Sequence, residues 1–419
     1  MLEVIEAQSR KENRIMLREA FIVEAVRTPF SPFGGPLRDV PSIELGATVI
    51  REIVKRSGLK GDEIDEIFYG MTQMAEAALY NNVCARQAAL LAGLPPTQVS
   101  LTIDRACCSS MAGAILAFRT IGSGEGDVIM AVGAENMSRT PQIAPPEIRW
   151  GQRMGPIVFR DCLSPLGHPG FPPESTNAGK TALEYGIGRE EQDEWAYRSQ
   201  MRYQEAKKAG KFQIGEELTP VEVPQKKGAP LVFSEDAFPK PDTTLEKLAK
   251  LRTIYDSPTV TPGNAPGLDT GASALLIVSE EGSKKLGLKP IAKIVATASV
   301  CTEPTMIAIN PGLAIQKVLS KAGMNVNQID LFEINEAFAA VPLVSSKILG
   351  DRDETKTKQI RERLNVNGGA IAIGHPVGAS AARLVMTLMY ELRRKGGGYG
   401  VASICGGLSQ GDAVMIKVG

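Results

Sequence analysis

Two stretches far apart in the chain repeat one pattern of apolar and polar positions. In "KRSGLKGDEIDEIFYGMTQM" (55–74) and in "SKAGMNVNQIDLFEINEAFA" (320–339), an amphipathic helix pattern ends at a glycine. An Ile-Asp step then leads into an apolar strand pattern. The matching positions are Gly58, Ile64 and Asp65 in the first stretch and Gly323, Ile329 and Asp330 in the second. Either the chain contains two copies of one α/β unit, or generic α/β segments are alike by chance.

The parallel continues downstream, and this favours duplication. After the first stretch, Cys107 opens a small-residue helix pattern that leads to the strand pattern "DVIMAVGAEN" (127–136). After the second, His375 precedes a long helix pattern that leads to "GYGVASICGG" (398–407). Alternating strands and helices of this length predict mostly parallel sheets covered by helices.

The patterns divide the chain into four parts. Residues 138–267 have no counterpart in the other copy and are rich in proline and glycine, apart from one strong helix pattern at 189–210. An insertion of this kind is well placed to cap a binding cleft. The predicted boundaries are an N-terminal extension (1–18), a first half (19–137, completed by 268–289), the inserted loop domain (138–267) and a second half (290–419).

Composition excludes several classes of protein. The chain has 419 residues, of which 43% are hydrophobic, and its 47 lysines and arginines balance 47 aspartates and glutamates. No net charge therefore favours nucleic acid or an anionic membrane, and no apolar run reaches the roughly 18 residues that span a bilayer. Six cysteines are too few for a disulfide framework and indicate a reducing cytoplasm. The cysteines lack the spacing of zinc sites and the chain has only two histidines, so the sequence predicts no metal site.

Three residues at equivalent places in the two copies are candidates for chemistry. If a helix begins at Cys107, free backbone N–H groups and the helix dipole favour its thiolate. His375 follows an apolar pattern that predicts a strand and precedes Pro376, a good first-turn residue, so we expect its ring to stay neutral. Cys405 ends a strand pattern and precedes two glycines that leave N–H groups free. Taken singly, these are equally a packed helix cysteine, a loop histidine and a core cysteine.

Several motifs together resemble the thiolase family, the acyl-CoA acetyltransferases, from about residue 19 to the end. They are "ARQAALLAGLP", "ENMSRTP", "GREEQDEWAYRSQ", "NEAFA", "NGGAIAIGHPVGASAAR" and "CGGLSQGDA", in family order and at family spacing. The resemblance implies the thiolase fold, in which two duplicated α/β halves form five layers (αβαβα) with an inserted loop domain.

The resemblance also implies roles for individual residues. Cys107 matches the nucleophile that carries the acyl group, and Cys108 matches the small residue after it, expected to be packing. His375 matches the histidine that activates the nucleophile, and Cys405 matches the acid/base cysteine. Asn335 matches the asparagine that holds a water in one oxyanion hole.

A second oxyanion hole is implied at Gly407, whose N–H would act together with that of Cys107. The implied reaction is a reversible Claisen condensation or thiolytic cleavage between acetyl-CoA and a 3-ketoacyl-CoA, with ping-pong kinetics. Coenzyme A thioesters would then be substrates and no cofactor would be needed. The family also implies a place in fatty acid metabolism and a homotetramer or homodimer.

The expected CoA pocket departs from the family pattern. The pocket is assigned to Leu251, Arg252, Ala265, Pro266 and Gly267. "GNAPG" replaces the common "GNASG", so Pro266 stands where a serine hydroxyl touches the pantetheine arm. "PES", Pro173 to Ser175, replaces the family's "HMG"; His168, a few residues earlier, either substitutes for the lost histidine or is an exposed loop residue. We expect an atypical acyl preference or pantetheine contact.

Two other functions compete with the thiolase interpretation. A decarboxylating condensing enzyme uses a Cys-His-His or Cys-His-Asn set, which the Cys405 position and the two histidines argue against. A catalytically weak scaffold subunit on the same fold has only the altered pocket in its favour.

Overall fold

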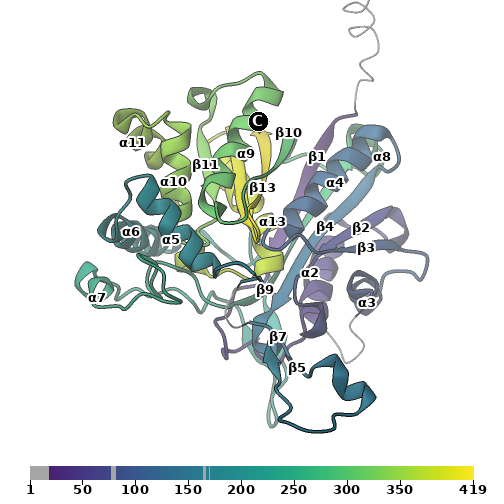
Figure 1. The fold of residues 1–419 in the computed structure, drawn as a ribbon. Helices are drawn as coiled ribbons and strands as arrows, with labels where there is room; N and C mark the ends of the chain where they lie inside the picture. The colour runs from purple at the N-terminus through teal and green to yellow at the C-terminus, as the bar shows by residue number, and fades with distance from the viewer. Residues whose placement is uncertain (1–17, 77–81, 164–166, 169) are drawn as a thin grey trace, which may run out of the picture.

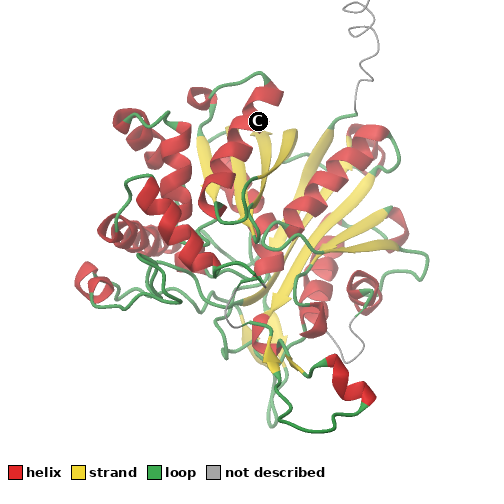
Figure 2. Cartoon of the chain, in the orientation of Figure 1, coloured by secondary structure: helices red, strands yellow, loops and turns green. Residues whose placement is uncertain are grey.

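A nine-stranded sheet runs through the described part of the protein (Figure 2). The computed structural model describes residues 18–419 except 77–81, 164–166 and 169. The predicted N-terminal extension therefore lies outside the described residues, apart from residue 18. The strands of the sheet are, in spatial order, β11 (Leu331–Ile334), β12 (Gly398–Gly406), β13 (Gln410–Val418), β10 (Ala292–Cys301), β1 (Ala20–Arg27), β9 (Thr270–Ser279), β4 (Val128–Asn136), β2 (Glu66–Gly70) and β3 (Val99–Ile103).

The sheet consists of two halves joined by one short contact. Strands β1, β9, β4, β2 and β3 form the first half, and β10 to β13 form the second. The halves meet where β1 pairs with β10 over only three residues, Ala20 to Ile22. The prediction of mostly parallel sheets is wrong: only β2–β3, β2–β4 and β11–β12 pair in parallel. Strands β12 and β13, for example, are joined by a tight turn, which permits only antiparallel pairing.

Helices lie on both outer faces and between the two halves, which gives the five layers predicted (Figure 1). The middle layer is α4 (Ser109–Ser123) and α13 (Val377–Arg394), which contact strands of both halves. The first half is covered outside by α2 (Ser42–Ser57), α3 (Cys84–Leu91) and α8 (Glu280–Leu286). The second half is covered by α9 (Asn310–Ala322). Helix α10 (Ala340–Leu349) packs on α9, and α11 (Glu354–Glu362) packs on α10.

The duplication is visible in matching hydrogen bonds. Helices α2 and α9 both end at a left-handed glycine, Gly58 and Gly323. Asp65 then accepts the N–H of Val128 at the start of β4, at 2.8 Å. Asp330 accepts the N–H of Tyr399 in β12 at 2.7 Å. The repeated Ile-Asp step therefore fixes the next parallel strand in the same way in both halves.

The segment between the halves carries the remaining elements. Its long helix α6 begins at Arg189, as the sequence predicts, and ends before Gly210, which is left-handed. The other elements here are β5 (Gln142–Ile143), β6 (Arg160–Asp161), α5 (Glu174–Glu184), α6 (Arg189–Lys208), β7 (Val221–Val223), β8 (Leu231–Phe233) and α7 (Leu245–Ala249). Short 3-10 helices occur at Gly61–Glu63, Met74–Glu76, Met137–Arg139, Pro146–Trp150, Ile307–Ile309 and Val326–Gln328. Helices α5, α6 and α7 lie beside the second half (Figure 1).

The middle layer packs backbone against backbone. A Cβ on Gly378 of α13 would lie 2.8 Å from the carbonyl oxygen of Ala134 and 2.9 Å from that of Gly70. A Cβ on Gly133 of β4 would overlap the carbonyl oxygen of Gly378. Glycine is therefore the residue that fits at these crossings, and the helices lie closer to the sheet than side chains would allow.

Gly133→Ala tests this packing. Its methyl group meets backbone atoms that cannot rotate away, so we expect a loss of about 1 to 3 kcal/mol in the free energy of unfolding, measured by urea denaturation. Gly188→Ala is the control, since Gly188 has φ −80° and no atom within 4 Å of its Cβ position. Equal stability of the two variants would contradict the close packing.

Candidate active site

Cys107 lies in a tight turn before α4, which begins at Ser109, two residues after the helix start that the sequence predicts at Cys107. The turn is held by Arg105, whose guanidinium donates to both carboxylate oxygens of the buried Asp412 in β13, at 3.0 and 3.2 Å. Ala106 has φ +48°, which is strained for a residue with a Cβ. The strain and the buried ion pair fix the position of the Cys107 backbone.

The expectation of a stabilised Cys107 thiolate is wrong for the unliganded chain. Burial, the charge of Glu174 and, more weakly, other carboxylates raise the pKa of Cys107 to about 12. The field at a helix N-terminus typically stabilises a negative charge by about 0.3–1 kcal/mol. The free-energy cost of desolvating a thiolate is larger. The neighbouring Cys108 is fully buried in the core between the sheet halves, consistent with packing.

Cys405 ends β12 against the turn that carries Cys107. The Cys108 thiol lies 3.7 Å from the carbonyl oxygen of Ile404, and the Cβ position of Gly407 lies 3.5 Å from the Cβ of Ala106. Cys405 is fully buried, and burial, followed by the charges of Cys107 and Glu174, raises its pKa well above the ordinary value. The structure therefore brings Cys107, Cys405 and Gly407 together.

His375 is fixed on three sides. Its backbone N–H donates to Asp269 at 2.5 Å, and its Nδ1 lies 2.6 Å from the Ser380 hydroxyl. That hydroxyl donates to the carbonyl of Pro376, so it accepts a hydrogen bond from Nδ1–H, and Nε2, which carries no proton, accepts a hydrogen bond from the Asn335 amide at 3.3 Å. Burial, together with the charge of Arg383, lowers the pKa of His375 to about 3, so the ring is neutral as expected.

The segment before His375 differs from the prediction. Its apolar run forms a short helical turn, α12 (Ala370–Ile373), instead of a strand. Backbone N–H groups of this region bond to side chains, as where Ile371 donates to Glu336 at 3.1 Å. The pattern of a short apolar run does not distinguish a buried turn from a buried strand.

Asn335 follows β11 and reaches His375. Its backbone N–H donates to Ser403 of β12, and its Nδ2 lies 3.3 Å from Nε2 of His375. Its Oδ1 is buried and has no hydrogen-bond partner among the described residues. A buried acceptor left open in this way suits an ordered water or a substrate atom.

The two halves are joined at the site by hydrogen bonds to the start of α13. Glu135 of β4 accepts the N–H of Gly378 at 3.0 Å, which places a buried carboxylate at the N-terminus of the helix. Ser110 of α4 accepts the N–H of Ala382 at 3.0 Å. The first turns of α4 and α13, with Cys107 and His375 just before them, are thereby held side by side.

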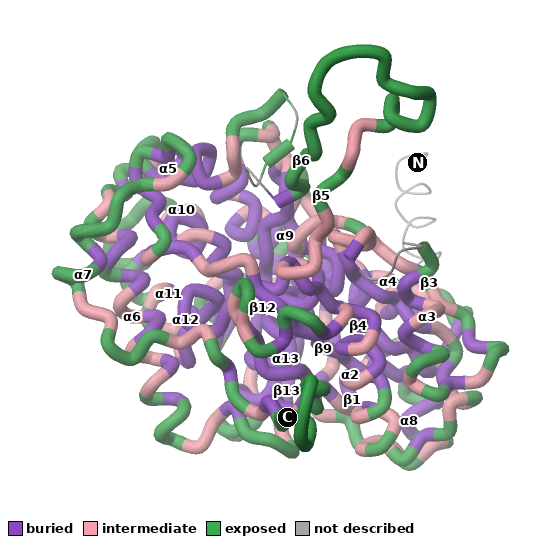
Figure 3. The backbone as a smooth tube through the Cα atoms, turned by 90° about the horizontal axis from the view of Figure 1, so that it is seen from below, coloured by how far each residue is buried: buried purple, intermediate pink, exposed green. Residues whose placement is uncertain are grey.

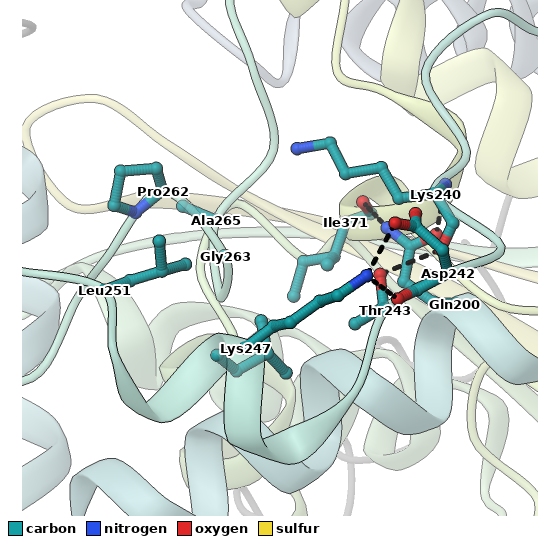
Figure 4. A pocket seen from close by; sticks show the side chains of 11 residues that line it. Gln200, Lys240, Asp242, Thr243, Lys247, Leu251, Pro262, Gly263, Ala265 and Ile371 are labelled. Carbon is teal, nitrogen blue, oxygen red and sulfur yellow. Dashed lines mark hydrogen bonds and ion pairs between the residues drawn. The ribbon is translucent and has the colours of Figure 1, made fainter.

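A cavity of ≈ 270 Å³ lies under α7 (Figure 4). Of the five residues assigned to the CoA pocket, Leu251 and Ala265 line it, whereas Arg252, Pro266 and Gly267 are outside its described lining. The lining also includes Gln200, Lys240, Asp242, Thr243, Lys247, Leu248, Pro262, Gly263 and Ile371. The loop that bears Ala265 joins the site through the N–H of Ala339, which donates to Asn264 at 2.9 Å.

Two residues of the inserted segment lie at the site: Glu174, to which the sequence assigned no role, and His168, for which it left two alternatives. Glu174, the first residue of α5, accepts the N–H of Leu408 at 3.0 Å. His168 lies with Nε2 3.9 Å from Glu174 and 2.7 Å from the Cβ position of Gly407. His168 is exposed, which agrees with the alternative of an exposed loop residue, but it lies at the site. A long insertion brings such residues to the site, so no motif spacing in the sequence indicates them.

Other kinds of site find no support in the described ranges. Within residues 18–419, leaving out the gaps given above, no group of three or more histidine, cysteine or acidic side chains could hold a metal ion. In the same part of the chain, the helices are too short or too polar to cross a membrane.

Alkylation of Cys107 tests its electrostatics. With a pKa near 12, its reaction with iodoacetamide should accelerate about tenfold per pH unit between pH 7 and 9. Glu174→Gln removes a charge that raises this pKa, so it should speed alkylation at each pH; Glu184→Gln, exposed at the far end of α5, should not. Peptide mapping by mass spectrometry separates Cys107 from the exposed Cys162 and Cys301. A rate independent of pH, or identical in both variants, would contradict this.

Comparison with known proteins agrees with this arrangement. Residues 20–281 match the family model "Thiolase, N-terminal domain", and residues 288–418 match "Thiolase, C-terminal domain". An acetyl-CoA acetyltransferase of Syntrophomonas wolfei is 40% identical over 413 residues, covering 96% of this chain and 100% of the relative. A β-ketoadipyl-CoA thiolase of Acinetobacter baylyi is 39% identical over 411 residues, covering 96% of this chain and 100% of the relative.

Solved structures extend the likeness to the fold. An acetyl-CoA acetyltransferase of Bacillus anthracis has a TM-score of 0.90 at 37% identity, covering 96% of this chain and 99% of that one. A human mitochondrial 3-ketoacyl-CoA thiolase in complex with CoA has a TM-score of 0.87 at 36% identity, with 96% and 99% covered. The chain belongs to the thiolase family.

Proposed function

We propose that this protein is an acyltransferase that catalyses reversible thiolysis and condensation between acetyl-CoA and a 3-ketoacyl-CoA. The observation that carries the proposal is the juxtaposition of two cysteines, Cys107 and Cys405, with a neutral, hydrogen-bonded His375 at the joint of the two halves. Family membership supports the same reaction.

The first half-reaction transfers an acyl group to Cys107. His375, whose Nε2 carries no proton, exchanges its hydrogen bond from Asn335 for the proton of the Cys107 thiol as sulfur attacks the thioester carbon. A base is needed because the thiol of the unliganded chain has a pKa near 12. The N–H groups of Cys107 and Gly407 then stabilise the tetrahedral oxyanion. Coenzyme A leaves as its thiol with the proton of Cys405, so an acyl-cysteine, a Cys405 thiolate and a protonated His375 remain.

The second half-reaction uses Cys405. In condensation, its thiolate removes a proton from the methyl group of acetyl-CoA, and the enolate oxygen is stabilised by the protonated His375 and a water on Asn335. The enolate carbon then bonds to the acyl carbon on Cys107, the bond from that carbon to the Cys107 sulfur breaks, and Cys107 takes its proton back from His375. The open Oδ1 of Asn335 supports this role. In thiolysis, Cys405 protonates the departing acetyl-CoA carbanion. The steps are acyl transfer, proton transfer and the formation or cleavage of one carbon–carbon bond, so the reaction calls on no cofactor.

The inserted segment 138–267 is proposed to cap the CoA cleft. The cavity beneath α7 supports this, with Lys240 and Lys247 at its rim as partners for phosphate groups (Figure 4). Pro266 offers no hydroxyl to the pantetheine arm, so the contact made by the family serine is proposed to be lost. The free thiols of all six cysteines fit a cytoplasmic enzyme, and fatty acid metabolism is the proposed setting.

We also propose a homodimer or homotetramer. Strand β3 is a sheet edge, and its Val99 and Leu101 are 58% and 46% exposed, as suits pairing with a second copy. The arm between β5 and β6 projects from the body and exposes apolar side chains, among them Trp150 at 84% and Met154 at 92% (Figure 3). Such an arm suits contact between two dimers.

Turnover tests the proposed reaction. The purified protein should convert acetoacetyl-CoA and CoA to acetyl-CoA, measured by the loss of acetoacetyl-CoA absorbance. Cys107→Ala should lower kcat at least about a thousandfold, because it removes the nucleophile. Cys108→Ala, one residue away in the core, should retain most activity. Similar loss in both variants would contradict the assignment of the nucleophile.

Light scattering tests the assembly. Leu101→Lys places a charge on the β3 edge, so the solution mass of the protein should fall by half or more. Leu183→Lys, which charges an equally exposed position on α5, should leave the mass unchanged. An unchanged mass for Leu101→Lys would exclude the β3 edge as an interface.

A further inference from the structure

Glu174 places a carboxyl group on the wall of the acyl site. It begins α5, and its Oε1 accepts the N–H of Leu408, the residue that follows Gly407. Its charge acts on the thiols of both Cys107 and Cys405. The carboxyl group therefore stands beside the position where the acyl group would be held on Cys107.

One oxygen of this carboxyl group is left without a partner. Oε2 is buried and makes no hydrogen bond to any described residue. The amide of Asn177, one turn along α5, donates to the carbonyl of Pro172 at 3.2 Å, and it also acts on the Glu174 carboxyl group, whose pKa it lowers against the raising effect of burial. The ring of His168 lies near the other oxygen, Oε1, at 3.9 Å. A buried polar atom that the protein leaves open calls for a ligand or another explanation.

The sequence departs from the family at this point. Glu174 is the middle residue of "PES", at the place where the resemblance implies the family's "HMG", so a carboxyl group would stand in place of a methionine side chain. Burial raises the pKa of Glu174, against the opposing effect of the Leu408 N–H. The Glu174 carboxyl group loses hydration here without gaining a full set of hydrogen-bond partners. Its side chain also contributes no packing that a methionine side chain would not contribute.

We propose that Glu174 determines acyl specificity: Oε2 accepts a hydrogen bond from a hydroxyl or ammonium group on the acyl chain bound to Cys107, and the carboxylate disfavours acyl chains that end in a carboxylate. The substrate class is thus acyl-CoA with a hydrogen-bond donor near the thioester. The proposal rests on the thiolase reaction proposed above. Discrimination of this kind is strong because a buried acceptor without its donor is left unpaired.

The acylation half-reaction reports the specificity for the acyl chain separately from the condensation step. The sulfur of Cys107 bonds to the acyl carbon, the bond from that carbon to the CoA sulfur breaks, and CoA leaves with the proton of Cys405 while His375 holds the proton of Cys107. The reverse step restores acyl-CoA. Exchange of isotope-labelled CoA into acyl-CoA therefore reports acyl transfer alone, without a second acyl substrate.

The experiment compares exchange with butanoyl-CoA, 3-hydroxybutanoyl-CoA, 3-aminobutanoyl-CoA and succinyl-CoA. The wild type should show kcat/KM about tenfold or more higher for the hydroxy and amino chains than for butanoyl-CoA. Glu174→Met should bring these ratios close to one, and both Glu174→Met and Glu174→Gln should raise exchange with succinyl-CoA about tenfold relative to butanoyl-CoA. Glu184→Gln, exposed at the other end of α5, should keep the wild-type ratios.

The outcomes separate the two proposals. Equal ratios in wild type and Glu174→Met, or wild-type use of succinyl-CoA as good as that of butanoyl-CoA, overturn the role of Glu174 while exchange with acetyl-CoA upholds the thiolase reaction. No exchange with any acyl-CoA, acetyl-CoA included, by a protein that unfolds cooperatively overturns both. If Glu174→Met does not fold, the isosteric Glu174→Gln decides through the succinyl ratio.

Discussion

The site depends on one packing constraint, the close approach of two helices to the sheet strands on both sides of them. Helices α4 and α13 fill the space between the sheet halves, and Gly133 and Gly378 allow backbone contact where they cross β4. The N–H of Ala382 in α13 donates to Ser110 in α4, so both helices start at the same edge of this middle layer. Cys107 and His375, which are far apart in the sequence, are brought to this edge by the two helices.

Much of this arrangement could be predicted from the sequence. The Ile-Asp step recurs because an aspartate must accept the N–H groups of the next strand in each half, and Asp65 and Asp330 do so. The glycines that end α2 and α9 are equally local signals. Cys405 and Asn335 were placed correctly at strand ends because a strand pattern marks its own end. Each of these features depends on a short stretch of sequence, where the residue pattern is informative.

What the sequence could not predict depends on contacts across the fold. The pKa of Cys107 is set by burial and by Glu174, which is distant in sequence, so the local helix-end argument gave the wrong direction. The apolar run before His375 is a helical turn because distant side chains satisfy its backbone groups. His168 and Glu174 reach Gly407 and Leu408 through a long insertion with no pattern of its own. Mixed strand directions likewise follow from connections that the patterns do not reveal.

The account's central claim is that the middle layer makes Cys107 the residue that carries the acyl group, with His375 as its base. The most direct measurement is to quench the protein with acid shortly after mixing with acetyl-CoA and to map the acetylated peptide by mass spectrometry. The account predicts acetyl on Cys107 in the wild type, and formation at least about a hundredfold slower in His375→Ala. Acetyl on another residue, or equal rates in the two proteins, would contradict it.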